Sequence, residues 1–360
     1  MKIVVACGGT GGHAFPGLAV AEALAGAGHE VTVWSSGRDV ESSVMKRWSG
    51  AVFATGARQL CARNIFAILA SIVRCRRAMR RARPDVLLAM GSYSSLPPVM
   101  AARSCGVPVV LHEANTVPGK AVDFLSRFAA VVATSFETTA RFLPRAHTVL
   151  TGLPVRCDIA SGRRFDFIPS ESFVVFVTGG SQGAHAVNLL MRDALVLFKR
   201  ELDRRGGGRP LYVIHQTGVK DEYEVRAAYA AASIPARVHA FEQAMPDAFA
   251  SADIVVARAG ASTCFELASC GKPALLIPLP SSMRDHQHHN AEAFAARGAA
   301  DEGLQAKLTP LQVCRYLLLK YDHPEQLAAM RERMAAMATP DAAARVAELV
   351  VKSLGPKVEG

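Results

Sequence analysis

Two segments about 170 residues apart have the same construction, and this repeat limits the possible folds more than any other feature of the sequence. Residues 4–17 read VVACGGTGGHAFPG and residues 174–188 read VVFVTGGSQGAHAVN, so in each an apolar run leads into a glycine-rich turn. A strand that passes through such a turn into a helix is the first unit of a doubly wound α/β domain. The repeat therefore predicts two Rossmann-like domains, each with a parallel sheet, and a ligand site in the cleft between them.

Short β-branched runs alternate with helical stretches rich in Ala, Leu and Arg, as in parallel sheets whose strands are connected by helices. We expect an N-terminal domain over 1–160, a C-terminal domain over 161–340, and a helix over 341–360 that returns toward the first domain. A polar stretch at 152–172 is expected to be the linker. The predicted strands lie at 2–7, 30–35, 51–55, 85–90, 108–112, 130–134 and 147–151 in the first domain, and at 173–178, 211–215, 237–241, 253–257 and 273–278 in the second.

Composition argues against several classes of protein. With 360 residues, of which 50% are hydrophobic and 20% charged, the chain is long and apolar enough to bury two cores. No window reaches the roughly 18 uninterrupted apolar residues that a membrane-spanning helix needs. The first residues, MKIVVACGG, run straight into a glycine loop and are expected to form a core strand, not a signal peptide. The eight cysteines stand singly, which is typical of a reducing cytosol without structural zinc. We expect a soluble, intracellular protein.

The net charge of +10 is concentrated in the first half of the chain, where residues 1–160 carry 18 Lys and Arg against 9 Asp and Glu. Such a half could meet nucleic acid or an anionic membrane. We expect no nucleic acid, because two Trp and six Tyr do not form a stripe on which bases could stack. Residues 62–83 instead hold seven arginines and no acidic residue, and are expected to form an amphipathic helix that binds an anionic membrane surface. Its predicted apolar stripe contains Ile65, Ile68 or Leu69, Ile72 and Met79, with Phe66 and Val73 beside it.

The first glycine loop, GGTGGH at 8–13, admits two interpretations. Gly9-x-Gly11-x-x-Ala14 matches the dinucleotide fingerprint, but that fingerprint also needs an acidic residue at the end of the second strand. The sequence there reads WSSG at 34–37, so an NAD-dependent oxidoreductase is only a weak alternative. The favoured interpretation is a nest of backbone N–H groups that approaches phosphate or sugar oxygens.

A stretch in the second half, ADIVVARAGASTCFELASCGKPALLIPLP at 252–280, predicts a buried strand, a turn of small residues and a helix. The start of this helix can receive a diphosphate, and Glu266, one turn further on, can accept hydrogen bonds from both ribose hydroxyls. The following segment, DHQHHN at 285–290, holds three histidines but has no companion carboxylate triad, and the sequence contains no D-x-D motif. We therefore expect neither a metal nor a cofactor.

An ordered set of motifs across residues 8–291 makes the chain resemble the MurG family of bacterial N-acetylglucosaminyltransferases. The motifs are GGTGGH-x-x-P, GSYSSLPP, LHEAN-x-x-PG, TGLPVR, TGGSQGA, HQTG, RAGASTCFELASCGKP and DHQHHNA. The resemblance implies a GT-B glycosyltransferase that moves N-acetylglucosamine from UDP-N-acetylglucosamine to the 4-hydroxyl of undecaprenyl-pyrophosphoryl-N-acetylmuramyl-peptide. It implies an inverting reaction without a metal, at the cytoplasmic face of the bacterial inner membrane. Other UDP-sugar enzymes of this architecture, such as a diacylglycerol glucosyltransferase or a UDP-sugar 2-epimerase, remain alternatives.

The resemblance also implies which residues bind the donor. Asn115 would contact sugar hydroxyls, Gln287 the N-acetylglucosamine, and Glu266 the ribose. Glu242 stands where the family often has an apolar residue whose main chain meets uracil. The full donor-binding set is Thr10, Gly11, Gly12, Asn115, Arg156, Ser181, Glu242, Ala261, Ser262, Thr263, Cys264, Phe265, Glu266 and Gln287.

An inverting transfer needs a general base that takes the proton from the acceptor hydroxyl. His13 is the first candidate because it ends the first glycine loop and can titrate near neutrality. Glu113 is the second candidate, and Tyr93 is expected to be a hydrogen-bond partner on the acceptor side.

Overall fold

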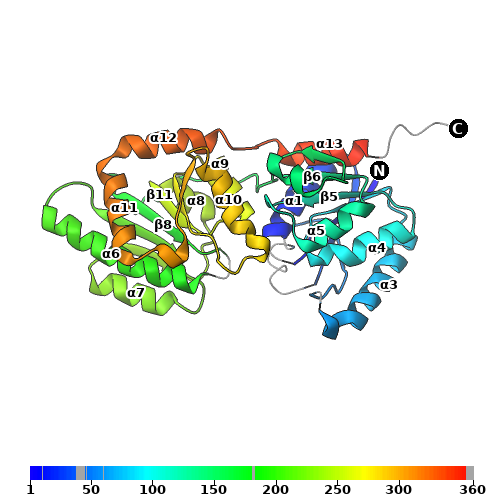
Figure 1. Cartoon of the computed structure of the whole chain (residues 1–360), viewed down its shortest axis with the longest axis horizontal. Coiled ribbons are helices and arrows are strands. Elements are labelled where there is room, and N and C mark those ends of the chain that lie inside the picture. Colours follow the sequence, from blue (N-terminus) through cyan, green and yellow to red (C-terminus); the bar gives the residue numbers. More distant parts are fainter. Residues whose placement is uncertain (10, 38–44, 46, 60, 181–182, 354–360) are drawn as a thin grey trace. The chain divides into compact units, whose positions relative to one another are not determined.

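The structure is a computed structural model that describes residues 1–360 except 10, 38–44, 46, 60, 181–182 and 354–360 (Figure 1). The chain divides into two compact units. The first comprises Met1–Arg156 together with the segment from Thr339 onward, and the second comprises Cys157–Ala338. Each unit contains one parallel sheet with helices packed on it, as the repeated strand–glycine–helix pattern predicts.

The first unit is built on a seven-stranded sheet with the order β3-β2-β1-β4-β5-β6-β7. Its strands are β1 (Lys2–Ala6), β2 (Glu30–Ser35), β3 (Ala51–Ala54), β4 (Val86–Ala89), β5 (Val109–Glu113), β6 (Val131–Thr134) and β7 (Thr148–Leu150). Its helices are α1 (Gly11–Gly26), α3 (Ile65–Ala82), α4 (Leu96–Ser104), α5 (Lys120–Leu125) and α13 (Ala342–Lys352), with short 3₁₀ helices η1 (Ala62–Asn64), η2 (Tyr93–Ser95), η3 (Ser126–Phe128) and η4 (Glu137–Phe142).

The side chains of β1 alternate between two cores, one on each face of this sheet. Ile3 and Val5 pack in a core with α1 and α13, whereas Val4 and Ala6 pack in a core with α3 and α4. Helix α13 contributes Val346 and Val350 to the first of these cores although it lies at the other end of the sequence (Figure 1). A strand buried on both faces has no polar alternation, which is why these runs are continuously apolar.

The second unit is built on a six-stranded sheet with the order β10-β9-β8-β11-β12-β13. Its strands are β8 (Phe173–Thr178), β9 (Leu211–Gln216), β10 (Ala236–His239), β11 (Ile254–Ala257), β12 (Ala274–Leu276) and β13 (Ala300–Glu302). Its helices are α6 (His185–Arg205), α7 (Glu222–Ala231), α8 (Met245–Ser251), α9 (Ala261–Ser269), α10 (His286–Ala295), α11 (Pro310–Asp322) and α12 (Pro324–Ala335), with 3₁₀ helices η5 (Met283–Asp285) and η6 (Gln305–Lys307).

Every predicted strand is present, but β13 has no counterpart among the predictions. It contains only three residues, Ala300–Glu302, and two of them are acidic. It is a strand because it pairs in parallel with β12 at the edge of the sheet. Such a short polar run carries no period-2 apolar signal from which a strand could be recognised.

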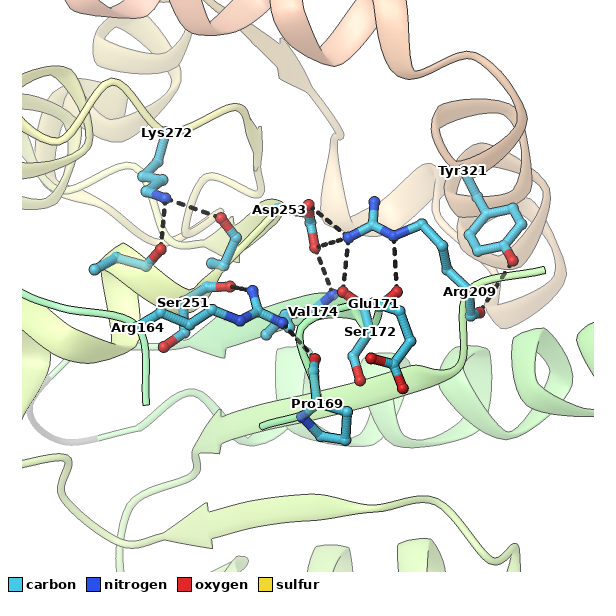
Figure 2. Close-up of polar contacts among 12 residues, drawn as sticks. Arg164, Pro169, Glu171, Ser172, Val174, Arg209, Ser251, Asp253, Lys272 and Tyr321 are labelled. Carbon is cyan, nitrogen blue, oxygen red and sulfur yellow. Dashed lines mark hydrogen bonds and ion pairs between the residues drawn. The ribbon is translucent and has the colours of Figure 1, made fainter. Parts of the chain in front are cut away.

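The predicted linker at 152–172 is wrong for most of its length, because residues 157–172 belong to the second unit. Arg164 donates to the carbonyl oxygens of Ser251 and Pro169 at 3.1 and 2.9 Å (Figure 2). Arg209 donates to the carbonyl oxygens of Glu171 and Ser172 and pairs with Asp253 at 2.9 Å. These hydrogen bonds attach the segment to the second unit and satisfy part of its backbone. Its polar composition therefore does not indicate a linker.

Each sheet reverses its strand order next to a glycine loop. In the first unit the chain crosses from β3 back to β4 beside β1, and in the second it crosses from β10 back to β11 beside β8. Ligands of open α/β sheets bind at the carboxyl ends of the strands at such a switch point. The glycine loops after β1 and β8 therefore mark the candidate site in each unit.

Candidate active site

The first glycine loop packs too tightly for larger side chains. A Cβ atom on Gly8 would lie 2.6 Å from the backbone nitrogen of Ser36, and one on Gly9 would lie 2.6 Å from Oγ of Ser92. Gly9 also has a φ of +111°, which L side chains rarely adopt. Ser94 donates to the carbonyl oxygen of Gly8 at 2.6 Å, which joins η2 to this loop. Thr10 lies outside the described residues, and Gly11 and Gly12 begin α1.

His13 lies in the first turn of α1 and is half-buried. Its Nδ1 is 2.9 Å from the carbonyl oxygen of Met90, the residue that follows β4. A carbonyl oxygen can only accept, so Nδ1 carries the hydrogen and Nε2 of the neutral ring carries the basic lone pair. This is the tautomer that a general base acting through Nε2 requires.

Glu113, the second candidate base, ends β5 and is only 3% exposed. Its Oε1 accepts hydrogen bonds from N and Nδ2 of Asn115 at 2.9 and 3.0 Å, and its Oε2 accepts one from N of Gly119 at 3.1 Å. Burial raises the pKa of Glu113, although these hydrogen bonds act in the opposite direction. Both oxygens thus hold the loop that carries Asn115, an arrangement that fits a positioning role better than proton transfer.

The other two predicted residues of the first unit follow strands β4 and β7. Tyr93 is half-buried and begins η2, whose Ser94 bonds to the glycine loop. Arg156 places its guanidinium 5.0 Å from the ring centroid of Phe15, in the first turns of α1. The structure therefore brings His13, Tyr93, Asn115 and Arg156 to elements at the carboxyl edge of one sheet.

The second glycine loop packs against the end of β9. A Cβ atom on Gly183 would lie 2.0 Å from the carbonyl oxygen of Thr217, and Gly183 has a φ of +73°. N of Gly180 donates to Oγ1 of Thr178 at 3.2 Å. Ser181 lies outside the described residues.

Helix α9 starts directly after the short loop that follows β11, with Gly260 as its extended N-terminal cap. The side chains of Ala261, Cys264 and Phe265 are buried, so of these predicted residues only the main chain can contact a ligand. Ser262, Thr263 and Glu266 are half-buried and can present their oxygens. The first turn carries no acidic residue, so its N–H groups suit an anion.

The histidines of the DHQHHN segment turn to separate partners. Nδ1 of His286 is 2.8 Å from the carbonyl oxygen of Met283, and Nδ1 of His288 is 2.6 Å from Oε1 of Glu302 on β13. The hydrogen bond that His288 donates to Glu302 raises the pKa of His288. Gln287, between them, accepts a hydrogen bond from N of Leu279 at 3.0 Å. Within the described part of the chain, no three His, Cys, Asp or Glu side chains gather into a possible metal site.

Arg258 is a functional candidate that the sequence predictions missed. It follows β11 and is buried, and burial lowers its pKa. Its guanidinium donates to the carbonyl oxygens of Ile277 and Pro278 and, at 2.7 Å, to Oε1 of Gln305. It thereby joins the loops after β11 and β12 to η6. The only available signal was an arginine directly after a buried strand, and that signal does not reveal its distant partners.

Glu242 is almost fully buried in the loop between β10 and α8, where Nε of Arg237 lies 2.7 Å from its Oε2. The carboxylate is therefore engaged within the protein. Only the main chain at this position is open to the ligand role that the resemblance implies.

Helix α3 has two apolar faces, so the predicted single stripe is wrong. Ile68 and Met79 face the core together with Ser71 and Cys75, because the inner face must pack on the sheet. A second set of apolar side chains points outward: Ile65 (53% exposed), Phe66 (83%), Leu69 (53%) and Val73 (48%). Among the described residues, none of the arginines between 63 and 83 forms an ion pair. No described helix is long and apolar enough to cross a membrane.

Family models match both units. The glycosyltransferase family 28 N-terminal domain matches residues 3–134, and the glycosyltransferase family 28 C-terminal domain matches residues 174–346. The chain is 35% identical to a protein of Geobacter sulfurreducens named "UDP-N-acetylglucosamine--N-acetylmuramyl-(pentapeptide) pyrophosphoryl-undecaprenol N-acetylglucosamine transferase", over 98% of this chain and 99% of that protein. A Myxococcus xanthus protein of the same name is also 35% identical, over 99% of this chain and 95% of its own length.

Solved structures agree with this similarity. The crystal structure of Acinetobacter baumannii MurG superposes with a TM-score of 0.77 at 30% identity, over 98% of this chain and 99% of that one. A structure described as a putative UDP-N-acetylglucosamine 2-epimerase from Listeria monocytogenes gives a TM-score of 0.71 at 13% identity, over 96% of this chain and 94% of that one. At that identity, the epimerase shows a common fold only.

Proposed function

Because this chain belongs to the MurG family of glycosyltransferase family 28, we propose that it transfers N-acetylglucosamine from UDP-N-acetylglucosamine to lipid-linked N-acetylmuramyl-pentapeptide. The observation that carries the proposal is the 35% identity over nearly the full length of relatives with this activity in their name. The two glycine loops at switch points supply the phosphate-binding elements that such a reaction needs.

The donor, in this proposal, is held mainly by the second unit. The start of α9 would receive the diphosphate, with Ser262 and Thr263 as hydroxyl donors. Glu266 would bind the ribose, and Gln287 at the start of α10 would bind the N-acetylglucosamine. The N–H groups at the start of α9 and the guanidinium of Arg156 would neutralise the departing nucleoside diphosphate, as a metal ion does in other enzymes.

The acceptor would be held by the first unit, with His13 as the general base. Its Nδ1 is engaged by the carbonyl of Met90, so Nε2 can take the proton from the acceptor hydroxyl as the new glycosidic bond forms. Tyr93 would hydrogen-bond on the acceptor side. Glu113 would position Asn115, since both of its carboxylate oxygens accept hydrogen bonds from the loop that follows it.

Attachment to the inner face of the cytoplasmic membrane would occur through α3. The exposed apolar set on this helix can enter the headgroup region while its arginines meet anionic lipids. Each basic residue near an anionic leaflet contributes about 1 kcal/mol. A lipid-linked acceptor places the reaction at this surface.

The experiment is a thermal-shift series followed by turnover. We expect UDP and UDP-N-acetylglucosamine to raise the melting temperature, and UDP-glucose and NAD to do so less or not at all. Incubation with UDP-N-acetylglucosamine and a lipid-linked N-acetylmuramyl-pentapeptide should yield the disaccharide product. Stabilisation by NAD in place of UDP, or transfer from UDP-glucose in preference to UDP-N-acetylglucosamine, would contradict the proposal.

A further inference from the structure

The second unit contains an ion pair, with a buried carboxylate and a half-buried arginine, at the ligand-binding end of its sheet. Glu242, 2% exposed, receives two hydrogen bonds from Arg237: Nε to Oε2 at 2.7 Å and Nη2 to Oε1 at 3.1 Å. N of Ala244, the N-terminal cap residue of α8, donates to the same Oε1 at 2.9 Å. Burial alone would raise the pKa of Glu242, but the hydrogen bonds from Arg237 and Ala244 hold it below its usual value. A carboxylate bound in this bidentate way is both ionised and fixed in orientation.

Arg237 also contacts two aromatic rings. Its guanidinium carbon lies 4.9 Å from the ring centroid of Phe165 and 5.8 Å from that of Phe167. The two rings stack on each other with centroids 4.9 Å apart. They belong to residues 157–172, the segment that is anchored to this unit, so the arginine contacts both a fixed carboxylate and a fixed aromatic surface.

Gln216 connects this pair to the glycine loop. Gln216 is the last residue of β9, and its side chain is buried. The side-chain amide accepts a hydrogen bond from N of Glu242 at 3.4 Å and donates one to the carbonyl oxygen of Gly180 at 2.7 Å. We call Arg237, Glu242 and Gln216 the Glu242 cluster. It ties together the loops that follow β8, β9 and β10, three adjacent strands of the sheet.

The strand order indicates which part of a nucleotide-sugar would meet this cluster. In the proposed function, the diphosphate and ribose lie at the loops after β8 and β11, and the transferred sugar lies at α10, after β12. A nucleotide-sugar is a linear molecule whose base is at the end opposite the sugar. The base would therefore lie on the β9 and β10 side, at the loop 240–244 that the Glu242 cluster holds.

We propose that Arg237, Glu242 and Gln216 are positioning residues that determine the selectivity of the donor site for uracil over cytosine. The two bases differ in the order of hydrogen-bond donor and acceptor along one edge, so a fixed peptide N–H and C=O can tell them apart. A mobile loop would adapt to either base. The side chains of the cluster need not touch the base, because they act by fixing the main chain of residues 240–244. This inference rests on the proposed function, since it assumes a uridine nucleotide as donor.

The test measures the affinities for UDP and CDP by calorimetry in the full-length protein. Arg237→Lys keeps the charge but loses the bidentate geometry, and Gln216→Met breaks the connection to Gly180. We expect each variant to lower the ratio of UDP to CDP affinity about tenfold, the effect of misplacing one or two hydrogen bonds. The donor KM should rise by a similar factor while kcat at saturating donor changes less.

A double variant separates positioning from stability. Arg237→Met with Glu242→Met removes both members of the ion pair at once, so neither charge is left without its partner. We expect it to melt within a few degrees of the parent protein, since the main loss is the acceptor of the Ala244 N–H, and still to have lost its selectivity for UDP. The matched control is Lys199→Met, which removes an exposed ion pair with Asp203 on α6 and should leave both affinities unchanged.

Two outcomes would overturn this inference. If the parent protein selects UDP and the double variant retains that selectivity, the Glu242 cluster has only a structural role, and the proposed function still stands. If the parent protein binds neither nucleotide, or prefers CDP, both the inference and the proposed donor are wrong.

Discussion

Glu266 is the residue on which the donor assignment depends most directly. It lies one turn into α9, half-buried, beside a helix start that carries no acidic residue. In the proposed site, Glu266→Ala would remove two charge-assisted hydrogen bonds to the ribose, so we expect the donor KM to rise by about 10- to 100-fold. Steady-state kinetics at fixed acceptor measure this, with Asp203→Ala on the exposed face of α6 as control. An unchanged KM would remove Glu266 from the site.

Single substitutions can distinguish the two candidate bases, His13 and Glu113. If His13 is the base, as proposed, His13→Ala should lower kcat by about 100-fold or more and affect the donor KM far less, because only the proton transfer would be lost. Glu113→Gln places an amide N–H against the donors of Asn115 or Gly119, and should lower the melting temperature while leaving the pH limb of kcat in place. The fall of kcat at acid pH reports protonation of the base. If it disappears in Glu113→Gln and persists in His13→Ala, Glu113 is the base and His13 is not.

Helix α3 makes a prediction at the scale of one element. Changing Arg76, Arg77, Arg80 and Arg81 to Glu reverses four exposed charges without touching the buried face formed by Ile68, Cys75 and Met79. We expect this variant to stop sedimenting with vesicles that contain anionic lipid. Binding of the parent protein should itself weaken as salt rises. Turnover of a soluble, short-chain acceptor should remain close to that of the parent.

A matched control separates the helix from the net charge of the chain. Reversing four exposed arginines of the second unit, Arg200, Arg297, Arg315 and Arg331, changes the net charge by the same amount. This variant should still bind the vesicles. Equal loss of binding in both variants would mean that overall charge, and not α3, governs the attachment. Full binding by the α3 variant at low salt would assign this helix a purely structural role.

At the scale of the whole molecule, each unit contains a fully buried histidine, His112 in the first and His215 in the second. Burial lowers the pKa of His112 to about 4 and that of His215 to about 3, from 6.5. Below pH 6.5 the unfolded chain therefore binds protons that the folded chain does not. The free energy of unfolding should fall as the pH decreases from about 6.5 toward 4, by on the order of 3 kcal/mol for His112.

Fluorescence can follow the first unit alone in this experiment, because the chain has two tryptophans, Trp34 and Trp48, and both belong to that unit. His112→Gln can still donate to the carbonyl oxygen of Gly152, which His112 contacts at 3.3 Å, but it does not titrate. Denaturant unfolding at pH 7 and pH 4.5 should show a smaller loss of stability in His112→Gln than in the parent protein. An equal loss in both would assign the acid sensitivity to other groups.

Local sequence patterns were sufficient for the fold class and for most strands. Runs such as VLLA of β4 and IVVA of β11 are buried on both faces, and their continuously apolar composition predicts this burial. The glycine loops were equally readable, since the close approach to Ser36 and Thr217 admits no side chain at Gly8 or Gly183. These features depend on short-range sterics and on burial common to a whole segment.

Only the tertiary structure decided the features that depend on a distant partner. Strand β13 exists because β12 offers it an edge, and residues 157–172 are anchored because Ser251 and Arg209 hold them. The two faces of α3 became distinct when one of them met the sheet. The side chain of Glu242 forms an ion pair because Arg237 lies on β10, the strand that precedes its loop. Sequence patterns report how much a segment is buried, whereas the partner of a buried charge is set by the path of the chain.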